Sequence, residues 1–242
     1  MSDTEVIIKG EVHTSKRDLK EEREILKEGV DHLILEGPEE KEWDFKITQI
    51  WYAWMLLIFE YLFAQIMYVD KTILEDIADI QGAERQYTRD SNASILENSH
   101  TLIKIAAAML FFLLFAAAIG LGLAGHVFGG VSLLLVSGLL PLLLLRIHES
   151  RRTDSGRDIQ IAQMVEEAAQ DGGRIVVIVG NAHAKRLPQI VSDDLPELDI
   201  RSPAHKLLSW PSAKELFYPW IVSFSAQYGV FVSILAYVRF AI

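Results

Sequence analysis

Apolar positions along the chain are gathered into long blocks, and the strongest of them runs from 105 to 145. Its one ionisable residue is His126. The block is far longer than the roughly 20 residues that a single membrane-spanning helix needs. Glycines interrupt it near its middle, so we expect two spans, about 103–124 and 131–145, joined by a tight turn. The sequence therefore predicts a transmembrane hairpin over 101–146.

Two further apolar segments lie on either side of this hairpin in the sequence. The segment 217–242 is rich in aromatic residues, and we expect a C-terminal transmembrane helix over 215–242. The segment 47–69 is equally long but contains Glu60. It could span the membrane, lie in the interface or pack against a soluble domain, and a carboxylate inside a spanning helix would be a functional candidate.

The polar blocks show the alternation and periodicity of an α/β domain. Short apolar runs ending in glycine predict strands, and amphipathic stretches predict helices. In chain order we expect a strand over 5–9, a helix over 15–28, a strand over 32–35, a helix over 158–170, a strand over 174–179 and a helix running toward 191. The predicted fold is thus an α/β soluble domain, split by an inserted transmembrane helical hairpin and followed by a C-terminal transmembrane helix.

Two of the predicted strands end in the same motif, Gly-x-x-His. Gly10 and His13 follow the first strand, and Gly180 and His183 follow the strand over 174–179. Glycine lets the backbone turn sharply off the strand, and the histidine then falls at the carboxyl edge of the sheet, where α/β sheets bind ligands. The simpler alternative for each histidine is a helix cap or a hydrogen-bonded polar group at a strand end.

These motifs resemble the TraB/PrgY family, which is related to the TIKI metalloproteases and to the erythromycin-esterase-like/ChaN-like group. The matching sequences cover 5–45 and 147–200 and are IIKGEVHTS, LILEGPEE with Glu36, SGRDIQIAQMV with Arg157, and VVIVGNAHAKRLP. The arginine motif fits least well, because Gly156 stands where family members often have an acidic residue. Arg152 is the alternative for that arginine.

The resemblance implies a metal-dependent hydrolase, peptidase-like as in the TIKI proteins, or linked to peptide-pheromone shutdown as in PrgY-like members. His13, His183 and Glu36 would bind a divalent metal, with manganese or cobalt plausible by resemblance. Two imidazoles and one carboxylate leave a position open for water. Arg157 could stabilise a developing oxyanion, and Glu11 or Glu36 could serve as general base.

Composition excludes several kinds of site and one class of partner. The 242 residues include no cysteine, so disulfides, zinc–thiolate sites and cysteine nucleophiles are excluded, and any metal has to be bound by histidine and carboxylate. The net charge of −10 argues against a nucleic-acid partner. We see no cleavable signal peptide at the acidic N-terminus. The expected partners are the lipid bilayer and a peptide substrate, and the sequence does not indicate an oligomeric state.

The positions of basic residues predict the orientation of the hairpin. Lys104 precedes it, and Arg146, Arg151 and Arg152 follow it, whereas the turn between the spans has no basic residue. Both ends of the hairpin, and with them the soluble domain, should therefore face the cytoplasm.

The two histidine motifs have to share one compartment to form one site, so the chain between them must cross the bilayer an even number of times. We therefore expect 1–45 and 147–205 to be two halves of one domain, with 46–100 as an interfacial or domain-packed helical connection. Two other functions remain open: a non-catalytic sensor, adaptor or regulator that binds a peptide or metal, and a small transporter-like membrane protein.

Overall fold

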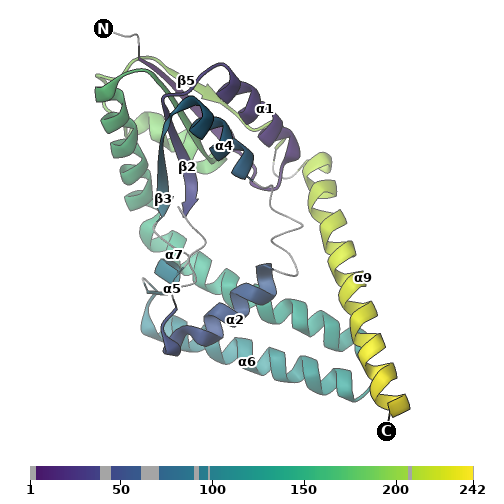
Figure 1. The fold of residues 1–242 in the computed structure, drawn as a ribbon. Helices are drawn as coiled ribbons and strands as arrows, with labels where there is room; N and C mark the ends of the chain where they lie inside the picture. Colours follow the sequence, from purple (N-terminus) through teal and green to yellow (C-terminus); the bar gives the residue numbers. More distant parts are fainter. Residues whose placement is uncertain are drawn as a thin grey trace. The chain divides into compact units, whose positions relative to one another are not determined.

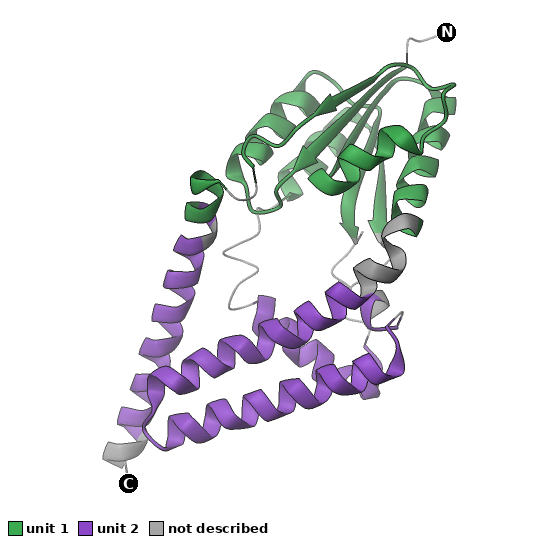
Figure 2. Ribbon diagram, turned by 180° about the vertical axis from the view of Figure 1, so that it is seen from behind, with its two compact units in different colours: residues 1–42, 68–92, 152–214 green, residues 43–67, 93–151, 215–242 purple. Residues whose placement is uncertain are grey.

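The computed structural model divides the chain into two compact units, coloured separately in Figure 2. Unit 1 comprises 1–42, 68–92 and 152–214, and unit 2 comprises 43–67, 93–151 and 215–242. The residues that the structure describes are 4–38, 45–60, 71–89, 93–97, 99–206 and 209–241, without the side chains of 38, 89, 93, 94, 149–155, 216 and 238–241. Each unit is described here by itself.

Unit 1 is built on a five-stranded sheet in which all neighbouring strands are parallel (Figure 1). The strands are β1 (Glu5–Glu11), β2 (His32–Pro38), β3 (Glu84–Arg89), β4 (Arg174–Gly180) and β5 (Leu198–Arg201). Their order across the sheet is β3-β2-β4-β1-β5. The predicted α/β class is confirmed for this unit. The two strands that carry the Gly-x-x-His motifs, β1 and β4, are direct neighbours.

Alternating residues of the central strands bury their side chains on opposite faces of the sheet, as the period of two requires. One face packs against α1 (Lys16–Lys27) and α4 (Thr72–Gln81), and the other packs against the C-terminal part of α7 (Val127–Asp171) and α8 (Asn181–Arg186). Ile7 and Leu33 belong to the first face, whereas Ile8 and Ile34 belong to the second. Both faces are covered, as is usual for a parallel sheet.

A buried ion pair ties β1 to α1. The Lys9 ammonium lies 3.0 Å from Asp18 Oδ1, and both side chains are 1% exposed. Lys9 also donates hydrogen bonds to Glu21 Oε2 and to the carbonyl of Ser202, which follows β5. Burial alone would lower the pKa of Lys9, but the hydrogen bonds from Lys9 to Glu21 and Asp18 and their charges raise it. Lys9 is therefore a structural cation on the α1 side of the sheet.

The segment that we expected to be a wholly helical connection, 46–100, contains a strand of the sheet. Residues 72–81 form α4 and residues 84–89 form β3, and both belong to unit 1. The β3 sequence ERQYTR has no apolar alternation because β3 is an edge strand with mostly exposed or half-exposed side chains. β5, at the opposite edge, was also missed: it has only four residues, none of which is buried.

Unit 2 consists of apolar helices. They are α2 (Ile50–Phe59), which follows the 3-10 turn η1 (Ile47–Gln49), then α5 (Ala93–Glu97), α6 (Thr101–Leu123), the N-terminal part of α7, and most of α9 (Trp210–Ala241). Three stretches are long and apolar enough to cross a membrane: Thr101–Leu123, Val127–His148 and Trp210–Tyr237, with mean hydropathies of 2.5, 2.3 and 1.4. This agrees with the three spans expected from the sequence.

The turn of the predicted hairpin is shorter than expected. It involves only 124–126, where Gly125 adopts a φ of 87°, while the later glycines of the block are already helical in α7. α7 also continues past Pro141 and the predicted end at 145, as far as Asp171. We expected the second span to end at 145 and a separate helix to begin at 158. In the structure, one continuous helix covers both segments and the polar residues between them.

The described part of the ambiguous segment 47–69 belongs to unit 2. Tyr52 and Met55 of α2 are fully buried in a core with residues of α5, α6 and α7. α2 has ten residues, and its C-cap is Glu60. The remainder of the predicted segment, 61–69, lies outside the described residues.

Candidate functional site

The carboxyl ends of β2, β4 and β1 bring the predicted site residues to one edge of the sheet. Gly180, the last residue of β4, is in register with Glu11, the last residue of β1. His13 follows β1 by two residues, and His183 lies in α8, which begins directly after β4. Glu36 lies near the end of β2, on the other side of β4. Three segments far apart in the sequence therefore converge.

The Glu36 carboxylate lies between the two histidines. His13 Nε2 is 3.9 Å from Glu36 Oε2, and His183 Nε2 is 3.7 Å from Glu36 Oε1. The Gly180 amide donates a 2.5 Å hydrogen bond to Glu36 Oε2. His183 and Glu36 are each 10% exposed, whereas His13 is 41% exposed. The site thus has two buried members and one that faces solvent.

The motif glycines are required by space and not by an unusual backbone conformation. A Cβ at Gly180 would lie 3.1 Å from Glu36 Oε2 and 3.6 Å from His13 Nε2. A Cβ at Gly10 would lie 3.1 Å from the Cβ of Ala184 and 3.2 Å from Asn181 Oδ1. Neither glycine has a positive φ. Our expectation of a sharp glycine turn is therefore replaced by close approach of β1, α8 and the Glu36 side chain.

Each histidine is held at its other ring nitrogen by a buried carboxylate. His13 Nδ1 lies 2.7 Å from Glu11 Oε1, and His183 Nδ1 lies 2.5 Å from Asp158 Oδ1. An ionised carboxylate only accepts hydrogen bonds, so Nδ1 is the donor in each contact, and in the neutral imidazole the lone pair is then on Nε2. The lone pairs are on the nitrogens that face Glu36. This arrangement is the one found around metal-binding histidines.

Glu11 is a strongly acidic carboxyl group. Its side chain is 3% exposed and also accepts a hydrogen bond from the Lys71 ammonium. Burial alone would raise the pKa of Glu11, but the hydrogen bond from His13 and the charge of Lys71 lower it to about 2. A carboxylate with so low a pKa is a weak proton acceptor at neutral pH. These properties suit Glu11 to orient His13, which leaves Glu36 as the better candidate for a general base.

Asp158 orients His183 as Glu11 orients His13, and it is itself bound by the guanidinium of Arg186. Arg186 Nε donates to Asp158 Oδ2 at 2.5 Å, and Arg186 Nη2 lies 3.2 Å from both Asp158 Oδ1 and His183 Nδ1. The Asp158 side chain is 3% exposed. Burial acts to raise the pKa of Asp158, but hydrogen bonds from Arg186 and His183 outweigh it and lower the pKa.

A further buried carboxyl group lies on α1. Glu22 is 1% exposed, and neither of its carboxyl oxygens has a hydrogen-bond partner within the described part of the chain. Burial, reinforced by the negative charge of Glu11, raises the pKa of Glu22 to about 9. Glu22 is therefore a neutral carboxylic acid at physiological pH, close enough to Glu11 to respond to its charge.

The expected role of Arg157, stabilising a developing oxyanion, stays a prediction. Arg157 is half-buried and directly precedes Asp158 on α7. The side chain of the alternative, Arg152, lies outside the described part of the structure. Arg186 contacts the Asp158 carboxylate, and Lys71 contacts the Glu11 carboxylate.

Sequence reasoning missed Asp158, Arg186 and Lys71. Two of them stand next to predicted residues: Asp158 follows Arg157, and Arg186 is one helical turn after His183. The spacing of three between His183 and Arg186 places them on one helix face, which was an available signal for Arg186, whereas adjacent residues such as Arg157 and Asp158 do not face each other. Lys71 had none, because it lies just before α4, in the segment we took for a connection.

The donor set suits a divalent metal, although it is not the most compact set in unit 1. His13, Glu36 and His183 offer two imidazole nitrogens and one carboxylate, with their second shell in place. Across the described residues, the group of three whose ligand atoms all lie within 4.8 Å of one another is His32, Glu84 and Asp171. The strand-end site spans a wider space, which a substrate or several water molecules could share.

Comparison of the chain with protein-family models, with curated proteins and with solved structures finds no match in any of the three. The function is therefore argued from the geometry of the site and from the motifs that resemble the TraB/PrgY family.

Proposed function

We propose that this protein is a membrane-anchored, metal-dependent hydrolase of the TraB type, acting on peptide-like substrates. The observation that carries the proposal is the pair of carboxylate–histidine contacts. Each imidazole has Nδ1 on a buried carboxylate and turns Nε2 toward the same group, Glu36. Two oriented lone pairs beside one carboxylate form a three-donor site.

His13 Nε2, His183 Nε2 and Glu36 would hold the metal, and the family resemblance favours manganese or cobalt. When bound, a divalent metal supplies Lewis acidity and lowers the pKa of a coordinated water molecule toward neutrality. The 41% exposure of His13 gives substrate access to this edge of the sheet. Buried His183 and Glu36 supply the fixed part of the site.

The surrounding residues divide the remaining tasks. Glu11 and Asp158 keep the two imidazoles in one tautomer, so neither ring has to reorient when a ligand arrives. Glu36 is available either as third ligand or as general base, held in place by the Gly180 amide. Arg186 neutralises Asp158, and Arg157 is the proposed stabiliser of negative charge on the substrate carbonyl oxygen.

We further propose that the helices of unit 2 anchor the enzyme in a bilayer, with 101–146 as a transmembrane hairpin inserted into the α/β domain. Only 17% of the Thr101–Leu123 window and 6% of the Trp210–Tyr237 window are buried within the structure, so their apolar surfaces are open to lipid. Lys104 and Arg146 at the ends of the hairpin favour a cytoplasmic α/β domain.

The test uses the full chain in detergent micelles, with a His13→Ala/His183→Ala variant and His205→Ala as the matched control. Bound metal is measured by elemental mass spectrometry after loading with Mn²⁺ or Co²⁺, and cleavage of a mixed peptide library is followed by mass spectrometry. We expect the double variant to bind one ion fewer per chain and to lose cleavage, while the control keeps both.

Unchanged metal content and unchanged cleavage in the double variant would overturn the hydrolase proposal. If the wild-type chain binds metal at these histidines but cleaves no peptide, the non-catalytic sensor or adaptor is the better description.

A further inference from the structure

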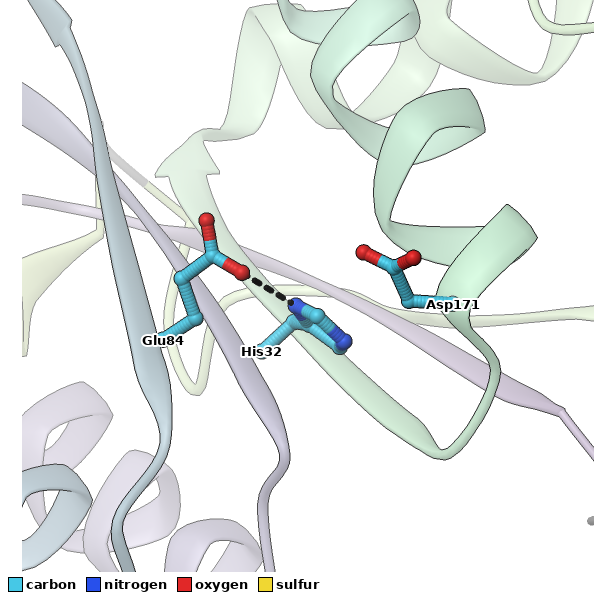
Figure 3. Close-up of side chains that lie close together, drawn as sticks. All are labelled: His32, Glu84 and Asp171. Atoms are coloured by element: carbon cyan, nitrogen blue, oxygen red, sulfur yellow. Dashed lines mark ion pairs between the residues drawn. The ribbon is translucent and has the colours of Figure 1, made fainter.

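We infer a second divalent-metal site at the opposite, amino-terminal edge of the same sheet, formed by His32, Glu84 and Asp171. Figure 3 shows the three side chains coming from β2, from β3 and from the end of α7. This inference does not depend on the proposed hydrolase function, because it shares no residue with the strand-end site.

The fold brings these three residues together in a defined way. His32 and Glu84 are the first residues of β2 and β3 and are partners in the parallel register, so their side chains emerge on the same face of the sheet. That face is the one covered by α7, because Ile34, two residues after His32, packs against α7 residues. Asp171 ends α7 directly before the Gly172–Gly173 turn that leads into β4.

The distances suit a shared ion. His32 Nδ1 lies 3.5 Å from Glu84 Oε2, and one ligand atom from each of the three residues lies within 4.8 Å of the others. Nitrogen and oxygen ligands about 2.0–2.2 Å from a tetrahedral Zn²⁺ are separated by about 3.3–3.6 Å. The His32–Glu84 pair already has this separation. Asp171 is exposed, so a rotation of its side chain can close the remaining gap.

A second observation points to a ligand at His32. Its side chain is only 12% exposed, and its Nδ1 atom is buried with no hydrogen-bond partner among the described residues. The nearest carboxylate oxygen, at 3.5 Å, is beyond good hydrogen-bond length. Buried polar nitrogens normally have a partner. A metal ion between His32, Glu84 and Asp171 would supply one.

The chemistry of the donors favours Zn²⁺ or a similar first-row divalent ion. One imidazole and two carboxylates are borderline-to-hard donors that leave at least one position for water. Glu84 is 58% exposed and Asp171 is also exposed, so the ion would exchange with solvent. By joining the edge strand β3 to the end of α7, the ion would fasten the amino-terminal edge of unit 1.

The two sites are separate along β2. His32 and Glu36 lie on the same face, four residues apart, which corresponds to about 13 Å along a strand. Asp158 and Asp171 likewise lie at different positions of α7, more than three helical turns apart. One ion therefore cannot serve both groups, and the two sites can be counted separately.

The test is a Zn²⁺ titration by calorimetry on the full chain in detergent, in a His13→Ala/His183→Ala background that removes the strand-end histidines. We expect this background protein to bind one Zn²⁺ per chain at the second site. Adding Glu84→Gln and Asp171→Asn should weaken that binding by about tenfold or more, because two anionic ligands become amides. Both substitutions replace an exposed carboxylate with an amide of nearly the same shape, so we expect the fold to be retained.

The matched control is Asp193→Asn/Asp194→Asn in the same background, which removes the same charge from an exposed loop. Unchanged affinity in the control and loss in Glu84→Gln/Asp171→Asn supports the site. Absence of Zn²⁺ binding in the background protein, or equal weakening by the control pair, would overturn it. His32→Ala with Co²⁺ absorption provides an independent readout: loss of the visible bands identifies the imidazole as ligand, and unchanged bands would contradict the inference.

Discussion

The histidines at the two edges of the sheet, the carboxyl edge and the amino edge, differ in how their Nδ1 atoms are satisfied. At the carboxyl end, His183 has its Nδ1 on buried Asp158, and Arg186 in turn holds that carboxylate. At the amino end, His32 has a buried Nδ1 without a hydrogen-bond partner in the described chain, and its neighbouring carboxylates are exposed. The first group is arranged before any ligand arrives, whereas the second would be completed by one. A preorganised site of this kind suits catalysis. The open arrangement at His32 suits an ion that links two secondary-structure elements, β3 and α7.

Among the substitutions at the two edges of the sheet, we expect Asp158→Ala to cause the largest loss of metal affinity and stability. The change removes the partner of His183 and leaves Arg186 without its carboxylate. We expect metal affinity at the strand-end site to fall about 10- to 100-fold. The free energy of unfolding should fall by about 1–3 kcal/mol, because a buried imidazole N–H loses its acceptor. Calorimetric titration and chemical denaturation measure the two effects.

Glu84→Ala is the matched change at the other end of the sheet. Glu84 is 58% exposed, so we expect metal-free stability to change by less than about 0.5 kcal/mol. Equal destabilisation by Asp158→Ala and Glu84→Ala would show that the carboxyl edge is no more preorganised than the amino edge.

The carboxyl edge was predictable from the sequence because its signals are local. Each motif follows a run of buried apolar residues, and the positions of Gly10, His13, Gly180 and His183 at strand ends follow from that pattern. Glu36 was expected only because the motifs resemble the TraB/PrgY family, in which a glutamate stands between the two histidine motifs. That these residues meet depends on the order β2-β4-β1, in which β4 lies between β1 and β2. The preference of sequential strands to be neighbours would have paired β1 with β2, so this order was not predictable.

The partners of the site residues were not predictable in this way. Lys71 reaches Glu11 across 60 positions of sequence, and Asp158 reaches His183 across 25. Such contacts follow from tertiary packing and leave no periodic trace in the chain. The edge strand β3 was missed because its polar side chains are mostly exposed, and with it the pairing of Glu84 with His32.

A second prediction compares the two histidines of the strand-end site. Glu11→Gln removes the negative charge beside His13 and leaves Lys71 unbalanced. We expect about tenfold weaker metal binding, less than for Asp158→Ala, because His13 is 41% exposed and a glutamine can still accept from Nδ1. Glu197→Gln, in an exposed loop, is the control and should leave affinity unchanged.

Glu11→Gln should also change how the free energy of unfolding depends on pH. The folded pKa of Glu11, about 2, lies below the ordinary glutamate value of 4.5, so its contribution to stability is present above about pH 4.5 and is lost as pH falls toward 2. Glu11→Gln should therefore reduce the acid-induced loss of unfolding free energy in this interval. An unchanged acid limb in denaturation curves recorded at successive pH values would contradict the assignment of Glu11 as an ionised, paired carboxylate.

The last prediction concerns Glu22, the neutral acid that distinguishes the carboxyl edge from the exposed carboxylates of the other edge. Its folded pKa, about 9, lies above the ordinary glutamate value of 4.5, so its contribution to stability is complete below pH 4.5 and is lost as pH rises toward 9. Glutamine cannot ionise in either state. Glu22→Gln should therefore raise the free energy of unfolding at pH 8, relative to wild type, by up to about 5 kcal/mol, because each pH unit above 4.5 counts for about 1.4 kcal/mol. The gain should shrink toward pH 5, because fewer unfolded molecules release a proton there. Glu24→Gln, on the exposed side of the same helix, should show no such rise between pH 5 and pH 8. A wild-type stability curve that is flat across this range, with Glu22→Gln parallel to it, would mean that Glu22 is ionised in the fold and that the carboxyl edge carries one more negative charge than the geometry implies.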